Sequence, residues 1–229
     1  MTSAAAKKLA VLADEIVGCR KCPRLVAHRE EVGRTKRRAY ASETYWAKPL
    51  PGFGDPKAKL LIVGLAPGAH GANRTGRVFT GDRSGDFLYA ALHRAKIASQ
   101  PDSKSKNDGL TLKGAFITMP CRCVPPDNKP LPIELSTCRP WLEREIALLP
   151  DVRSVLALGS IAYAAMLRFD GAKDAPPFAH GATTSIRLGK REVALVASYH
   201  VSQQNTQTGR LTPAMFDRVL QCVIEASCP

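Results

Sequence analysis

Four short apolar segments, each followed by a polar loop and then by a segment with helical periodicity, constrain the fold of this chain more than any other feature. The apolar segments, interpreted as strands, are residues 59–64, 115–119, 154–158 and 192–197. The helical segments are residues 84–97, 133–148, 160–168 and a C-terminal helix that begins at Thr212 and Pro213. Repeated strand–loop–helix units are typical of a parallel sheet with helices on both faces. The sequence therefore predicts an α/β fold, a three-layer α/β/α sandwich with a central, mostly parallel, four-stranded sheet.

Two further signals complete the expected arrangement. Residues 3–17 have helical spacing and stop at Gly18, and Gly189 predicts a hairpin turn whose second arm is the fourth strand. The chain has 229 residues, a normal length for one α/β domain, and contains no internal repeat. Residues 1–229 are therefore predicted to form a single domain.

The charge of the chain indicates a polyanionic partner. There are 33 Lys and Arg residues against 20 Asp and Glu residues, a formal net charge of +13. The excess is concentrated in the block Arg34–Arg38 and in the loop that carries Arg74, Arg77 and Arg83, which favours nucleic acid over solubility alone. We see no apolar run of ~18 residues and no signal peptide, and expect an intracellular, cytoplasmic protein without membrane contact.

The loop from Gly64 to Asp82 is the strongest candidate for a functional site. It carries five glycines between a predicted strand and a predicted helix with Ser84 as N-cap, whereas such loops usually run ~2–6 residues unless they are functional. Glycines allow the backbone to approach a ligand closely. The loops after the second and fourth strands are also long and polar, and the carboxyl ends of parallel strands meet at one edge of a sheet. We therefore expect these three loops to form one site.

Seven cysteines in an intracellular chain indicate metal binding or catalysis rather than disulfides. Cys19 and Cys22 form a close CxxC pair, and Cys123 and Cys138 stand further apart. This spacing is compatible with a structural zinc ion and with a [4Fe–4S] cluster about equally, and unliganded buried thiols are a third interpretation.

Long motifs across the chain resemble the iron–sulfur uracil-DNA glycosylases, in particular their family 5 (type b) branch. The first is Gly64-Leu-Ala-Pro-Gly-Ala-His-Gly-Ala-Asn-Arg-Thr-Gly-Arg-Val-Phe-Thr-Gly-Asp82, and the second is His200-Val-Ser-Gln-Gln-Asn-Thr-Gln-Thr-Gly-Arg-Leu211. The cysteines match that family's cluster ligands in type and order. The resemblance, which spans residue 19 to about residue 212, implies a structural [4Fe–4S] cluster on Cys19, Cys22, Cys123 and Cys138.

The resemblance also implies the activity. It implies a monofunctional DNA glycosylase of base-excision repair, which hydrolyses the N-glycosidic bond of a flipped-out uracil and leaves an abasic site. Hypoxanthine, xanthine and cytosine adducts are the further substrates that this branch suggests. Cleavage builds positive charge on the sugar and negative charge on the base. We predict that Asp82 positions water or stabilises the sugar; without the resemblance, the residues alone favour a cap or dipole partner for the helix at residue 84. His200 would donate to a base carbonyl. Asn128 would hold water or base, with turn formation as its alternative.

Further residues are assigned to the base and to DNA. Phe79 would stack on the extruded base, and backbone N–H groups at Gly64, Ala66 and Gly68 would line the base pocket. Met119 stands where the wider family often has Asn, which suits a broader pocket. The predicted DNA-contacting residues are Arg74, Arg77, Gln203, Gln204, Asn205, Arg210 and a hydrophobic wedge, Leu211.

Two other functions are alternatives to a DNA glycosylase. The glycine spacing of Gly76–Gly81 resembles a phosphate-binding loop, but the Lys-Ser/Thr that must follow is replaced by Asp82, which excludes a nucleotide cofactor. The remaining alternative is a non-enzymatic iron–sulfur protein that binds DNA and senses redox state. The expected partner is single- or double-stranded DNA that contains uracil or other deaminated bases, bound by a monomer associated with the nucleoid.

Overall fold

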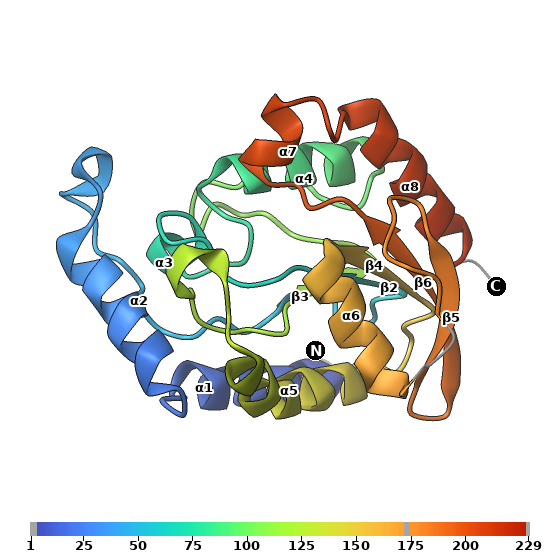
Figure 1. The fold of residues 1–229 in the computed structure, drawn as a ribbon, viewed down its shortest axis with the longest axis horizontal. Coiled ribbons are helices and arrows are strands. Elements are labelled where there is room, and N and C mark those ends of the chain that lie inside the picture. The colour runs from blue at the N-terminus through green and yellow to red at the C-terminus, as the bar shows by residue number, and fades with distance from the viewer. Residues whose placement is uncertain (1–3, 172–174, 228–229) are drawn as a thin grey trace.

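A sheet of six strands runs through the centre of the molecule, with helices on both faces (Figure 1). The computed structural model describes residues 4–171 and 175–227. The strand order is β1-β3-β2-β4-β6-β5. The strands are β1 (Phe53–Gly54), β2 (Leu60–Val63), β3 (Ala115–Thr118), β4 (Ser154–Leu158), β5 (Thr183–Leu188) and β6 (Arg191–Ser198). The four inner strands are parallel, and β1 and β5 pair antiparallel at the two edges.

The parallel core of the sheet and the layered α/β/α arrangement confirm the predicted fold class, and the number of strands corrects it from four to six. The four inner strands coincide with the four apolar segments to within two residues at each end. The edge strand β5 is the first arm of the predicted hairpin. The other edge strand, β1, is only two residues long and lies between prolines, so no periodic pattern marks it in the sequence.

Eight α-helices are described. They are α1 (Ala4–Val17), α2 (Pro23–Thr35), α3 (Ala72–Thr75), α4 (Arg83–Arg94), α5 (Pro132–Ala147), α6 (Ser160–Asp170), α7 (Gln203–Gln207) and α8 (Pro213–Glu225). Two short 3₁₀ turns lie at Arg38–Tyr40 and Pro126–Asn128. The helices α3 and α7 lie inside segments that the sequence pattern assigns to loops. No helix in the described part of the chain is long and apolar enough to cross a membrane.

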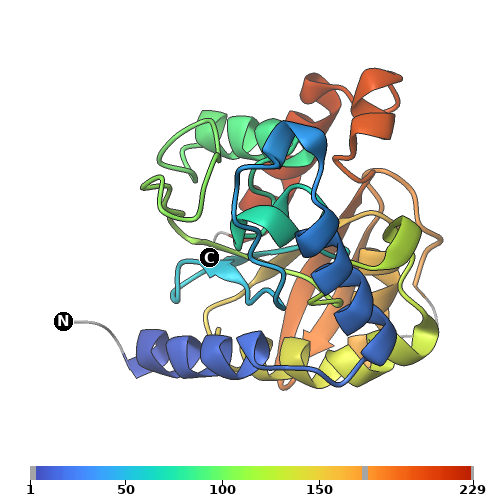
Figure 2. The same cartoon turned by 90° about the vertical axis from the view of Figure 1, so that its left-hand side faces the viewer.

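The alternation of side chains along β2 divides the core into two layers. Leu60 and Ile62 belong to the cluster that packs under α4 and α8, and Leu61 and Val63 belong to the cluster that packs under α5 and α6. All four side chains are buried, which is expected for a parallel strand covered on both faces. The helix α1 lies along α5 at the outside of this second layer, and α2 rises beside α3 (Figures 1 and 2). The carboxyl ends of the inner strands therefore all point to one edge of the sheet.

Candidate active site

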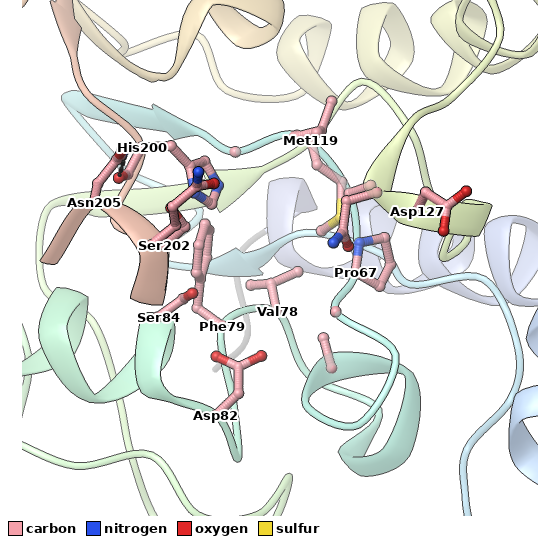
Figure 3. Close-up of a pocket in the computed structure, with 17 residues that line it drawn as sticks. Pro67, Val78, Phe79, Asp82, Ser84, Met119, Asp127, His200, Ser202 and Asn205 are labelled. Atoms are coloured by element: carbon pink, nitrogen blue, oxygen red, sulfur yellow. Dashed lines mark hydrogen bonds between the residues drawn. The ribbon is translucent and has the colours of Figure 1, made fainter. Parts of the chain in front are cut away.

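A cavity of about 440 Å³ opens at the carboxyl edge of the sheet (Figure 3). Its wall is built from the loop after β2, the end of β3, the 3₁₀ turn after β3 and the loop after β6. The structure thus brings together the three loops that the sequence predicts to meet. The predicted site residues that line the cavity are Gly64, Ala66, Gly68, Phe79, Asp82, Asn128, His200, Gln204 and Asn205.

The carboxylate of Asp82 caps α4 and faces the cavity at the same time. Its Oδ1 accepts the Gly85 N–H at 3.0 Å, and the extended backbone at Asp82 is typical of an N-cap. The capping interpretation is therefore confirmed for Asp82, and the N-cap predicted at Ser84 is wrong. The other oxygen, Oδ2, packs against two glycines, because an added Cβ would lie 2.9 Å from it at Gly68 and 1.8 Å at Gly71. Burial raises the pKa of the Asp82 carboxyl, and the N–H groups of Gly85 and Ser84 oppose this shift.

The ring of Phe79 lies between the start of the loop and His200. A Cβ added at Gly64 would come within 2.8 Å of the Phe79 ring, so only glycine allows the end of β2 to approach it this closely. The ring centroids of Phe79 and His200 are 6.2 Å apart, with the planes inclined by 36°. Phe79 has φ of 48°, a left-handed conformation that costs energy for a non-glycine residue. The loop therefore holds an aromatic face in the cavity at the expense of backbone strain.

His200 follows β6, and a hydrogen bond to its backbone carbonyl fixes its position. The Asn205 amide Nδ2 donates to the His200 carbonyl oxygen at 2.8 Å. Burial lowers the pKa of His200 to about 4, so the imidazole is neutral at pH 7 and carries one N–H donor. Asn205, predicted to contact DNA, thus fixes the backbone of His200 while its side chain lines the cavity.

Three residues that were predicted to contact DNA have buried side chains in the structure, so the prediction is wrong for them. The Arg74 guanidinium, on a side chain that is 9% exposed, donates to the carbonyl oxygens of His70 at 2.7 Å and Gly81 at 2.9 Å. Arg77 is buried in an ion pair with Asp108 at 2.7 Å. Both arginines brace the loop from inside. Leu211 is fully buried in the core cluster beneath α4 and α8, where it cannot act as a wedge.

The other predicted DNA-contacting residues lie at the surface. Gln203, Gln204 and Arg210 are exposed on α7 and just after it, and the Arg210 guanidinium lies 4.7 Å from the centroid of the Tyr199 ring. Their contacts with DNA stay predictions. Asn128 is exposed at the rim of the cavity with φ of 56°, so it does form the turn that was its alternative role.

Further residues that line the cavity include five on its two sides. Figure 3 shows Ser84 and Ser202 on the side of Asp82, Phe79 and His200, with Pro67, Met119 and Asp127 across the cavity. The resemblance implied a role in the pocket for Met119, at the end of β3, and for none of the other four. Ser202 could have been found from its place two residues after His200, within the same motif.

The four cysteines predicted as cluster ligands line a second cavity, of about 20 Å³. Cys19 and Cys22 come from the connection between α1 and α2, Cys123 from the loop after β3 and Cys138 from α5. Cys121 does not line this cavity; its Sγ lies 3.3 Å from the Cys123 carbonyl oxygen. Among the described residues, no group of three or more His, Cys, Asp and Glu side chains is placed to hold a metal ion.

The surroundings of these thiols test whether they fit an anionic cluster. Arg29 Nη1 donates to Cys123 Sγ at 3.0 Å, and the Arg122 N–H donates to Cys138 Sγ at 3.3 Å. The Nε atoms of Arg29 and Arg122 are buried and have no hydrogen-bond partner within the described part of the chain. Burial raises the pKa of Cys138 to about 12, so deprotonation of this thiol requires positive charge nearby. Four thiols from three segments, with the buried Arg29 guanidinium beside them, fit a group that carries negative charge, while the Arg122 guanidinium pairs with Glu145 at 2.9 Å.

The chain was compared with known proteins. A model of the uracil DNA glycosylase superfamily matches residues 51–223. The type-5 uracil-DNA glycosylase of Thermus thermophilus is 56% identical over 206 residues, which cover 90% of this chain and 92% of that protein. The type-5 enzyme of Mycobacterium leprae is 51% identical over 96% of both chains, and that of Pyrobaculum aerophilum is 41% identical over 94% of this chain and 92% of its own. The chain thus belongs to the uracil-DNA glycosylase superfamily and, within it, to the type-5 uracil-DNA glycosylases.

Proposed function

We propose that this protein is a monofunctional DNA glycosylase of base-excision repair, which hydrolyses the N-glycosidic bond of a flipped-out uracil in DNA and leaves an abasic site. The single observation that carries the proposal is the convergence of Asp82, Phe79 and His200 on one cavity. These residues supply a carboxylate, an aromatic face and a neutral donor, which together meet the demands of base extrusion and cleavage. The names of the type-5 relatives support the same activity.

The proposed reaction divides the developing charges between two sides of the cavity. Water adds its oxygen to the sugar carbon, and the N-glycosidic bond breaks with its electron pair moving to the base. Oδ2 of Asp82 positions the water and stabilises the cationic sugar, while Oδ1 stays bound to the start of α4. The N–H of the neutral His200 ring stabilises negative charge on a base carbonyl, and the proton lost by water neutralises the released base. Asn128 assists at the rim.

The proposed pocket admits more than uracil. Met119 presents a thioether to the cavity, and a thioether does not distinguish the donors and acceptors on the edge of a base as an amide does. We propose hypoxanthine, xanthine and cytosine adducts as further substrates. Phe79 and the backbone at Gly64, Ala66 and Gly68 would form the stacking face and the floor. Gln203, Gln204 and Arg210 would contact DNA.

The cofactor in this proposal is a structural [4Fe–4S] cluster held by Cys19, Cys22, Cys123 and Cys138. The cluster, when bound, would join the α1–α2 connection, the loop after β3 and α5. Because Cys123 lies five residues before Asn128, the chain that binds the cluster is the chain that forms one rim of the cavity. Iron and acid-labile sulfide in the purified protein would support the cluster. Zinc in their place would contradict it.

One experiment separates the enzyme from the alternative, a DNA-binding iron–sulfur protein that senses redox state. A labelled duplex with a single uracil is incubated with the protein and treated with alkali, which cuts the strand at an abasic site. We expect strand scission by the parent, and loss of most scission with retained duplex binding by Asp82→Asn. Tight binding without scission by the parent would establish the non-enzymatic alternative. We further propose that residues 1–229 form one domain and that the protein is a cytoplasmic monomer associated with the nucleoid.

A further inference from the structure

The basic block Arg34–Arg38 lies outside the cavity, at the end of α2 and the start of the segment between α2 and β1. This segment, residues 36–48, stands beside α3 at the left of Figure 1 and lies in front of the sheet in Figure 2. It exposes Arg37, Arg38 and Lys48, and the loop after α4 adds the exposed Lys106. We call these four residues the basic flank. None of the four forms an ion pair with a carboxylate in the described part of the chain.

Hydrogen bonds fix this segment to the wall of the cavity. The Tyr45 hydroxyl accepts the Arg37 N–H at 3.3 Å and lies 3.1 Å from His70 Nδ1. The N–H groups of Trp46 and Ala47 donate to carbonyl oxygens of α3 at 2.9 and 3.0 Å. Because α3 contributes Ala72 to the cavity wall, the basic flank has a fixed position relative to the candidate base pocket.

Two of the four cationic side chains lie close to the ring of Trp46. The ammonium groups of Lys106 and Lys48 lie 4.5 and 5.5 Å from its ring centroid. A Cβ added at Gly76 would lie 3.0 Å from this ring, so the indole packs closely on the end of α3. Two like charges held near one aromatic group raise the local positive potential, which favours the binding of an anion at this surface.

We propose that the basic flank binds phosphates of the DNA duplex beside the extruded base. The proposal rests on the proposed function, which places DNA over the cavity. A base that has left the stack lies in the cavity while its duplex lies across the rim, and the flank adjoins that rim on the side of α3. Exposed cations on fixed loops bind the phosphate backbone without reading sequence. The flank therefore contributes to duplex affinity and to its salt dependence, and leaves the cleavage step unchanged.

The salt dependence of binding tests this proposal. Two double variants, Arg37→Gln/Arg38→Gln and Lys48→Gln/Lys106→Gln, remove two charges each and are measured for affinity to a uracil-free duplex of about 30 base pairs between 50 and 200 mM salt. Each lost phosphate contact lowers the slope of log K against log salt by ~0.9. We expect each pair to lower the slope by ~1.8, so that the loss of affinity over this salt range becomes about tenfold smaller. Arg37→Lys/Arg38→Lys should keep the parent's slope.

The matched control removes two charges at the opposite edge of the sheet. Lys113 and Lys190 are exposed at the amino ends of β3 and β6. Lys113→Gln/Lys190→Gln should keep the parent's slope. If the control variant lowers the slope of log K against log salt as much as the two flank variants do, the proposal is wrong, because the net charge of the protein would then account for the salt dependence.

Base release distinguishes this inference from the proposed function. In single-turnover assays at saturating protein, both flank pairs should release uracil at the parent's rate. If the parent releases uracil but the two flank variants keep the parent's salt dependence, the proposal for the basic flank is wrong and the proposed function stands. Absence of release by the parent overturns the proposed function, while lowered flank slopes would still support a DNA-binding surface.

Discussion

Replacement of Gly71 by alanine tests whether the position of the Asp82 carboxylate determines the rate of base release. A Cβ at residue 71 would lie 1.8 Å from Oδ2 and 2.5 Å from Cγ of Asp82, whereas ordinary contact begins at 3.4 Å. The carboxylate or the loop must therefore move by roughly 1.6 Å. Because a misplacement of ~1 Å can lower a rate ~10²-fold, we expect single-turnover release of uracil to fall on the order of 10²- to 10³-fold.

The assay must separate the rate from binding and from folding. Saturating protein over a single-uracil duplex removes the contribution of affinity. The displaced Asp82 also loses its cap on α4, which costs about 1 kcal/mol, so thermal unfolding should show a small loss of stability and no loss of cooperativity. Gly18→Ala is the control, since an added Cβ there would lie 3.6 Å from the nearest atom. It should release uracil at the parent's rate.

A double-mutant cycle identifies the group through which Gly71→Ala acts. In an Asp82→Ala background there is no carboxylate to displace, and only the contact between the two Cβ atoms, at 2.9 Å, remains, so Gly71→Ala should lower release far less than in the parent. Release by Gly71→Ala within threefold of the parent would refute the importance of the carboxylate position. A large additional loss in the Asp82→Ala background would show that the substitution acts through the loop backbone instead.

Three further predictions concern the pocket, its histidine and the thiol-lined cavity. Met119→Asn should raise the ratio of uracil to hypoxanthine release about 5- to 150-fold, measured on single-lesion duplexes, because an unsatisfied buried amide costs ~1–3 kcal/mol; an unchanged ratio would contradict a specificity role. The pKa of His200 is about 4 in the folded protein and near 6.5 when unfolded, so the unfolded state binds more protons between these values, and stability falls as the pH drops from 6.5 to 4. Urea unfolding should show a loss of up to about 3 kcal/mol at pH 4 that His200→Gln reduces, and an identical loss in this variant would assign it to other groups. Cys138→Ser should abolish iron binding while Cys121→Ser retains it, since Cys138 lines the cavity formed by the four thiols and Cys121 does not; equal iron content in the two variants would contradict the proposed ligand set.

The layered fold was predictable because the four inner strands are buried on both faces. Such strands appear as continuous apolar runs, of which Leu60–Val63 is the clearest. Their parallel arrangement then places the three long polar loops at one edge, where the structure has the cavity. The edge strand Phe53–Gly54 could not be predicted, because two residues are too few for a periodic pattern and they pair with β3, which lies more than 60 residues further along the chain.

The roles of individual charged and apolar residues were less predictable, because they depend on partners far away in the sequence. Arg77 faces inward because Asp108, from the loop after α4, forms an ion pair with it. Arg74 faces inward because Glu43, from the segment after α2, reaches it. Leu211 is buried because α7 forms and returns the chain to α8, which the polar composition of that loop does not indicate.

The double attachment of Asp82 restricts how this pocket can be altered by evolution or by design. Glutamate at this position would be one methylene too long to keep the carboxylate both on the Gly85 N–H and in the niche beside Gly71, and alanine would lose both. Glutamate or alanine here therefore combines a loss of stability with a change in chemistry, whereas asparagine can keep the cap and changes the chemistry alone. Met119 caps no helix, but its side chain lines the cavity and also packs in the core cluster beneath α4 and α8. A change of substrate range at Met119 therefore requires a side chain of similar volume, because a smaller one would leave a void in this cluster.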